Sequence, residues 1–129
     1  MLPFPLKLQP GDPIYLQIVA AVKRAVATGL MVPGDRFPAV RTIASELGVN
    51  PNTVQKAVAE LTARGLIEVH PGQGCYVAVR VPVRREAQAA ALRPLVRQLL
   101  IESRHQGMAH DDLLDLLQRE HTKLDEPRH

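Results

Sequence analysis

The spacing of apolar residues predicts a regular series of helices in the first half of the chain. Apolar side chains recur every three or four positions over residues 14–26, which is the repeat of a helix with one buried face. Pro13 fits the first helical position and Asp12 the cap before it, because proline has no amide hydrogen to lose there. Gly29 would end this helix, and the Pro-Gly-Asp sequence at 33–35 predicts a tight turn.

Two further helices are predicted close together. A short one is expected over residues 37–48, where Gly48 supplies the C-terminal stop. Pro51 then opens the next helix, with Asn50 as a preferred N-cap, and the helical pattern runs to about Ala63. A helix, a short turn and a second helix form the helix-turn-helix arrangement.

Two short strand-like runs follow, at residues 66–70 and 75–79, and they flank the turn Pro71-Gly72-Gln73-Gly74. This order predicts a hairpin directly after the third helix, which is the position of the wing in a winged helix. Glycines at its tip would let the backbone approach phosphates or enter a minor groove. A plain β-turn, taken alone, would explain these glycines equally well.

The remainder of the chain predicts a two-helix tail after a linker at residues 81–83. One helical pattern runs over residues 84–106 and contains Pro94. A proline inside a regular helix costs roughly 3 kcal/mol, so a kink or a restart is expected there. A last helix would begin at Asp111, with acidic residues in its first turn.

Two amphipathic helices of this length cannot close a core alone, so a second copy of the chain is the economical partner. The apolar residues expected at this contact are Leu92, Leu95, Val96, Leu99, Leu100, Leu113, Leu116 and Leu117. The expected fold class is therefore mainly α (α+β): a winged helix-turn-helix over residues 1–80 and a two-helix dimerisation tail over 81–129.

The helix from Pro51 has a polar beginning and an apolar continuation. Amide side chains can pair with base edges, and Thr and Lys can reach bases or phosphates. A helix with such a first turn is suited to enter the DNA major groove end-first. The same stretch, taken alone, is equally compatible with an ordinary surface helix that has a good cap.

Composition narrows the classes of function. The hydrophobic content of 46% in 129 residues supports a packed core, in one domain or in a small domain with an appendage. No run approaches about 18 apolar residues, so no membrane span is expected. The single cysteine, Cys75, leaves no internal disulfide framework and suits a reducing cytoplasm.

Charge is distributed unevenly along the chain. The first 80 residues hold eight Lys and Arg residues against five acidic ones, and the rest of the chain holds eight of each. The first part could therefore face a polyanion while the second serves another purpose.

Five ordered motifs together resemble the GntR family of bacterial transcription regulators. They are Ile14-Tyr15-Leu16-Gln17-Ile18, Pro33-Gly34-Asp35-Arg36-Phe37-Pro38-Ala39-Val40-Arg41, Val49-Asn50-Pro51-Asn52-Thr53-Val54-Gln55-Lys56-Ala57, Gly65-Leu66-Ile67 and Gly72-Gln73-Gly74-Cys75-Tyr76-Val77. The Asn-Pro-Asn-Thr-Val segment and the short two-helix tail look like its YtrA subfamily.

The resemblance implies a cytoplasmic, nucleoid-associated homodimer, most simply a repressor, that binds double-stranded operator DNA as an inverted repeat. The residues that it places at the DNA are Arg41, Asn50, Asn52, Thr53, Gln55, Lys56, His70, Gly72 and Gly74. Many family members have Arg where this chain has Pro51 and Gln55, so the strongest guanine readers are absent and an A·T-tolerant half-site is expected. The family's usual small hydroxyl residue is replaced by Ala39 in the Pro-x-x-Arg segment and by Cys75 in the wing, and each replacement removes a possible phosphate contact.

Other classes of function have less support. No cofactor and no metal site are predicted, because the five histidines show no tight ligand spacing. No nucleophile–base pair or phosphate loop predicts an enzyme. A winged-helix module for protein–protein contact, without an operator, is the alternative, and it would more naturally expose a hydrophobic patch at the wing. An unidentified small-molecule effector is left open, since nothing in the sequence names one.

Overall fold

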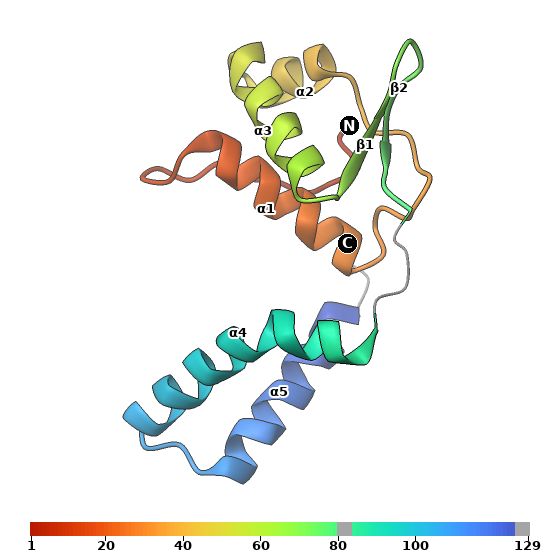
Figure 1. Ribbon diagram of the computed structural model, residues 1–129. Coiled ribbons are helices and arrows are strands. Elements are labelled where there is room, and N and C mark those ends of the chain that lie inside the picture. Colours follow the sequence, from red (N-terminus) through yellow and green to blue (C-terminus); the bar gives the residue numbers. More distant parts are fainter. Residues whose placement is uncertain (80–83, 126–129) are drawn as a thin grey trace. The chain divides into compact units, whose positions relative to one another are not determined.

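The computed structural model describes residues 1–79 and 84–125, and these two stretches form two compact units. The first unit contains α1 (Ile14–Ala27), α2 (Val40–Leu47), α3 (Pro51–Ala63), β1 (Ile67–His70) and β2 (Gly74–Val77), and the second contains α4 (Arg85–His105) and α5 (His110–Asp125). Figure 1 shows this order, and it confirms the predicted mainly helical fold with a two-stranded hairpin after the third helix. The expected linker at 81–83 lies outside the described residues.

The first helix begins one residue later than predicted, so the predicted Asp12 cap is wrong. Pro13 itself occupies the cap position with an extended backbone, φ −56° and ψ 132°, and no side chain caps the helix. The Pro13 carbonyl instead accepts from the amides of Leu16 and Gln17, at 3.1 and 3.2 Å. Proline thus fixes the geometry of the turn from outside the helix rather than as its first residue.

The second helix is shorter than predicted, because residues 36–39 are extended. Pro38 disfavours a helical conformation for the residue before it, and Ala39, at the cap position, has ψ 149°. The helix therefore begins at Val40 and not at Phe37. Its predicted end is confirmed: Gly48 has φ 67° and donates its amide to the Ala44 carbonyl.

The core of the first unit lies where α3 packs against α1, α2 and β1. Ile18, Val22 and Leu61 are among its fully buried residues. The lead-in before α1 is irregular, as predicted, but it also contributes to this core. Phe4 is 1% exposed and stacks on Phe37, with ring centroids 6.0 Å apart, so both phenylalanines of the chain are used to pack it.

The hairpin strands pair antiparallel, with Ile67 opposite Val77 at the buried end. A third extended segment joins them, because Arg36 forms an antiparallel bridge with Tyr76. The amide of Phe37 donates to the Cys75 carbonyl at 2.8 Å. The wing is thus a small sheet with an extra edge that the sequence pattern did not predict.

In the second unit α4 is one continuous helix through Pro94. Of the kink or restart predicted there, the restart is wrong. Of the eight residues expected to form the dimer contact, Leu113 is only 4% exposed within its own unit. Leu100 and Leu116 are half-buried, and the other five are exposed: Leu92, Leu95, Val96, Leu99 and Leu117. Over residues 1–79 and 84–125, no helix combines the length and apolarity needed to cross a membrane.

Candidate nucleic-acid interface

The first turn of α3 is fixed by the cap that the sequence predicted. The Asn50 Oδ1 accepts from the Asn52 amide at 2.8 Å, and Pro51 occupies the first helical position. Behind this turn Val54 and Ala57 are fully buried. The helix is therefore anchored along its back, and its beginning is held rigidly at the surface of the unit.

The polar side chains at this end of α3 differ in their exposure and in whether they already form a hydrogen bond. Asn52 and Gln55 are exposed, and within the described residues neither side chain is engaged in a hydrogen bond. Asn50 is also exposed, but its oxygen already serves the cap. Thr53 is half-buried. Asn52 and Gln55 are thus the amides that can offer both donor and acceptor to a base edge without breaking a contact.

Lys56 does not extend freely from α3. Its Nζ lies 4.2 Å from the centroid of the Tyr15 ring, a cation–π contact between α3 and the start of α1. Lys56 remains exposed. The ring therefore holds the ammonium group at the surface, and Tyr15 becomes a positioning residue that the sequence pattern had not singled out for this role.

Arg41 lies in the first turn of α2 and is exposed. Among the described residues it forms no ion pair, unlike Arg64, whose Nε lies 2.9 Å from Glu60 Oε1. A guanidinium without a carboxylate partner is available for a phosphate or a guanine edge.

The wing is built around a stacked pair of rings. His70 and Tyr76 stack with centroids 4.7 Å apart, and the Tyr76 hydroxyl donates to the Gln73 carbonyl at 3.3 Å, which ties the strand to its turn. Gly72 and Gly74 have φ of 75° and 103°, a conformation that side chains rarely adopt. The turn requires these glycines, and at these two positions its tip carries no side chain.

The predicted DNA-binding residues therefore share one compact unit. In Figure 1 the first turn of α3, helix α2 and the tip of the hairpin lie at the same end of that unit. Across the described residues, no group of three His, Cys, Asp or Glu side chains could hold a metal ion.

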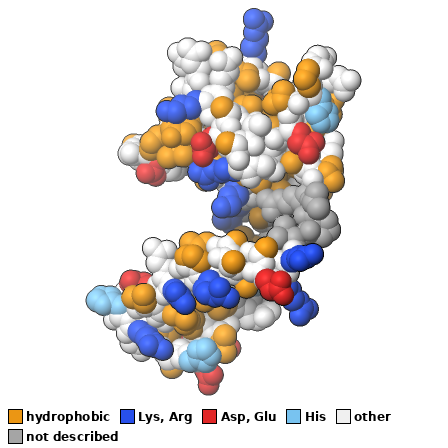
Figure 2. All heavy atoms as spheres, in the orientation of Figure 1, with side chains coloured by type: hydrophobic (Ala, Val, Ile, Leu, Met, Phe, Trp, Pro, Cys, Tyr) orange, Lys and Arg blue, Asp and Glu red, His pale blue; other side chains and the backbone are white. Residues whose placement is uncertain are grey.

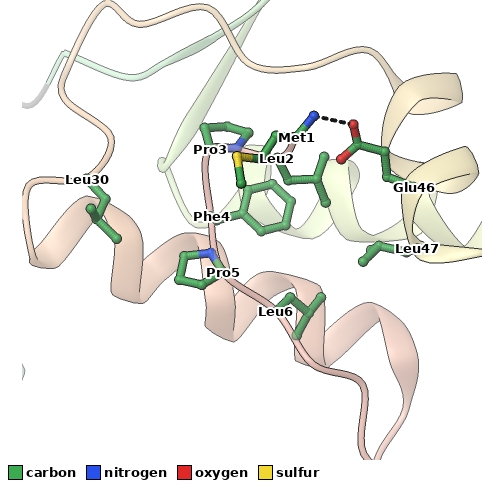
Figure 3. A pocket seen from close by; sticks show the side chains of 9 residues that line it. All are labelled: Met1, Leu2, Pro3, Phe4, Pro5, Leu6, Leu30, Glu46 and Leu47. Atoms are coloured by element: carbon green, nitrogen blue, oxygen red, sulfur yellow. Dashed lines mark hydrogen bonds and ion pairs between the residues drawn. The ribbon is translucent and has the colours of Figure 1, made fainter. Parts of the chain in front are cut away.

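The first unit also contains a shallow apolar hollow of about 640 Å³, and none of these side chains is among its lining residues (Figure 3). Its lining comes from the lead-in, from Leu30 after α1 and from the end of α2, where Glu46 supplies the carboxylate. Phe4, which forms part of its floor, belongs to the core already described.

The comparisons with known proteins agree with this geometry. Residues 14–77 match the model of the bacterial regulatory proteins of the gntR family. The chain is 35% identical over 104 residues to the HTH-type transcriptional repressor YtrA of Bacillus subtilis, covering 80% of each.

Solved structures are similar as well. A transcriptional antiterminator from Listeria monocytogenes, at 26% identity, superimposes with a TM-score of 0.79 and covers 98% of this chain and 95% of its own. The DNA-binding domain of AraR, solved in complex with operator ORX1, is 26% identical with a TM-score of 0.51, and the match covers 57% of this chain and 93% of that one.

Proposed function

The chain belongs to the GntR family of bacterial transcription regulators and is YtrA-like within it, and from this premise we propose that it is a homodimeric repressor of an inverted-repeat operator. As a member of this family it is a DNA-binding regulator and not an enzyme. We place its action in the cytoplasm at the nucleoid, where operator DNA lies.

The observation that supports the proposal most directly is the rigidly capped, polar beginning of α3. Asn52 and Gln55 would read bases in the major groove, and their amides favour adenine. Arg41 and Lys56 would hold phosphates on either side and fix the orientation of the helix. Specificity would thus depend on amides, and affinity on the cations and the wing.

Dimerisation is supported by the tail. Leu92, Leu95, Val96 and Leu99 repeat at helical spacing along α4, and all four are exposed within the unit. Figure 2 shows hydrophobic side chains on the surface of this unit among lysines and arginines. A contiguous exposed apolar stripe of this kind marks an interaction site, and a second copy would cover it by the same stripe.

The test is a selection of duplexes from a random library, followed by mobility-shift titrations across a range of salt concentrations. We expect an inverted repeat with A·T pairs in the half-sites, and a steep fall in affinity with rising salt. Arg41→Ala should weaken binding, whereas Arg24→Ala, an exposed arginine in the last turn of α1, should not. Recovery of no common sequence would reject the operator, and salt-insensitive binding would reject the assigned roles.

A further inference from the structure

We propose that Arg36 is a further DNA-contacting residue. It lies on the edge of the wing, and its guanidinium would act as a phosphate anchor, that is, it would bind a phosphate of the DNA backbone. This inference rests on the proposed function. The residue lies in the segment between α1 and α2, where the sequence predicts a tight turn at 33–35 and a helix from residue 37, and no strand. The structure instead makes it part of the sheet.

The backbone around Arg36 is held on both sides. The Val77 amide donates to the Asp35 carbonyl at 2.8 Å, and the Phe37 amide donates to the Cys75 carbonyl at the same distance. Phe37 is buried in the core. The backbone of Arg36 is therefore held in an extended segment beside β2, and this fixes the position of its Cα and Cβ atoms.

The register places Arg36 on the outer face of the wing. Residues directly opposite each other in antiparallel strands point to the same side of the sheet. Arg36 is opposite Tyr76, which is opposite Glu68, and His70 lies two residues further along the same strand. This face is polar, and it is the face toward which the stacked rings of His70 and Tyr76 project.

The guanidinium reaches along this face to the turn. A Cβ added to Gly74 would lie 3.6 Å from Arg36 Nη2 and 3.9 Å from its Nε. The positive charge is thus brought against the backbone of the residue that closes the wing tip. The guanidinium therefore lies within van der Waals reach of Gly74, beside the part of the wing that would meet DNA.

The charge of Arg36 is available to an outside partner. Arg36 is exposed, and no carboxylate in the described stretches lies close enough to form an ion pair with it. The acid on the same face, Glu68, is already engaged by His70 Nε2 and by the Val79 amide, both at 3.3 Å. A rigidly mounted, unpaired guanidinium is suited to bidentate contact with a phosphate.

The experiment measures binding to a generic duplex of random sequence over a series of KCl concentrations. Each phosphate contact contributes about 0.9 to the slope of log affinity against log salt. Arg36→Gln should lower the slope by about 0.9 for each subunit bound and weaken binding roughly fivefold per subunit at physiological salt. Arg36→Lys should keep the slope, since the charge is kept, and bind with intermediate affinity.

Arg24→Gln is the matched control, because it removes one exposed arginine from α1 and leaves the wing intact. An inactive fraction that is the same at every KCl concentration shifts the measured affinity and leaves the slope unchanged, so a constant loss of folded variant does not imitate the effect. If Arg36→Gln and Arg24→Gln give the wild-type slope, Arg36 is no anchor and the proposed function still stands. If the wild-type protein itself shows no salt dependence, the phosphate contacts assigned to Arg41 and Lys56 are wrong as well, whereas the proposed function fails only if the selection recovers no common sequence.

Discussion

At the scale of the residue, Asn50 has two roles that compete for the same atom. Its Oδ1 caps α3 through the Asn52 amide, whereas a bidentate contact with adenine needs both the oxygen and the nitrogen of the amide. The cap is part of the fold before DNA arrives, so we expect it to prevail. Asn50 would then contribute to DNA binding through its amide nitrogen alone.

Replacing Asn50 separates the two roles. Asn50→Ala should lower the free energy of unfolding by about 1 kcal/mol, the usual loss when a cap is removed. Asn50→Asp keeps a capping oxygen and adds a charge that the helix N-terminus favours, so stability should be retained. Its carboxylate cannot donate to a base and repels phosphates, so DNA affinity should fall.

Urea unfolding and mobility shift, measured on the same preparations, check this prediction. Asn52→Ala is the control for stability, because the Asn52 group that meets the cap is its backbone amide, which the substitution leaves in place. The prediction fails if Asn50→Asp is as unstable as Asn50→Ala, since the cap would then not depend on the oxygen.

At the scale of the element, local signals predicted most boundaries. Gly48 and Asn50 specify their helix end and helix start through their own backbone and side chains, and both were predicted from neighbouring residues alone. The same holds for the polar front of α3. Such features depend on a few consecutive residues, and a sequence pattern contains all of them.

Features that depend on distant residues were not predictable in the same way. The pairing of Arg36 with Tyr76 joins segments far apart in the chain, and the stacking of Phe4 on Phe37 does the same. The contact of Lys56 with Tyr15 is another example. No periodicity within a single segment reports these contacts, because each depends on how two elements pack.

The continuous path of α4 through Pro94 leads to a prediction at this scale. Proline removes one backbone hydrogen bond and crowds the preceding turn, at a cost of about 3 kcal/mol in a helix interior. Pro94→Ala should therefore raise the free energy of unfolding by up to about that amount, read from chemical denaturation.

Pro94 lines a shallow hollow of about 450 Å³ together with Arg93, Arg97, Gln98 and Ile101. Gln88→Ala, at an exposed position of α4 that does not line this hollow, is the control for a simple gain in helix propensity. If Pro94→Ala is no more stable than Gln88→Ala, contacts of the proline ring in the assembled protein offset its cost within the helix, and the substitution should then weaken dimerisation.

At the scale of the whole molecule, the two units differ in how much of their apolar surface is buried. The first unit has a buried core of its own and presents its polar groups at the surface. In the second unit, among the described residues, Leu113 is buried, whereas all four residues of the apolar stripe on α4 are exposed. A helical unit with so little buried apolar surface cannot be stable alone, so we expect its folding to depend on association.

Leu99→Asp tests this dependence. Burying one leucine contributes about 1.5–3 kcal/mol, and a two-fold interface loses it twice. The dimer should therefore weaken by roughly a hundredfold or more, given tenfold for each 1.4 kcal/mol. Sedimentation velocity over a concentration series would show monomers, and affinity for an inverted repeat should fall by about 10²–10⁴ with the loss of linked half-sites.

Gln98→Asp places the same charge on the neighbouring residue, outside the stripe, and should leave the dimer intact. A duplex with a single half-site supplies the second control: Leu99→Asp should bind it as the wild-type unit does, because α3 and the wing belong to the other unit. If Leu99→Asp stays dimeric, the stripe on α4 is not the contact. If it becomes monomeric and keeps full affinity for the inverted repeat, the repeat is not read by two linked copies, and each unit binds DNA independently.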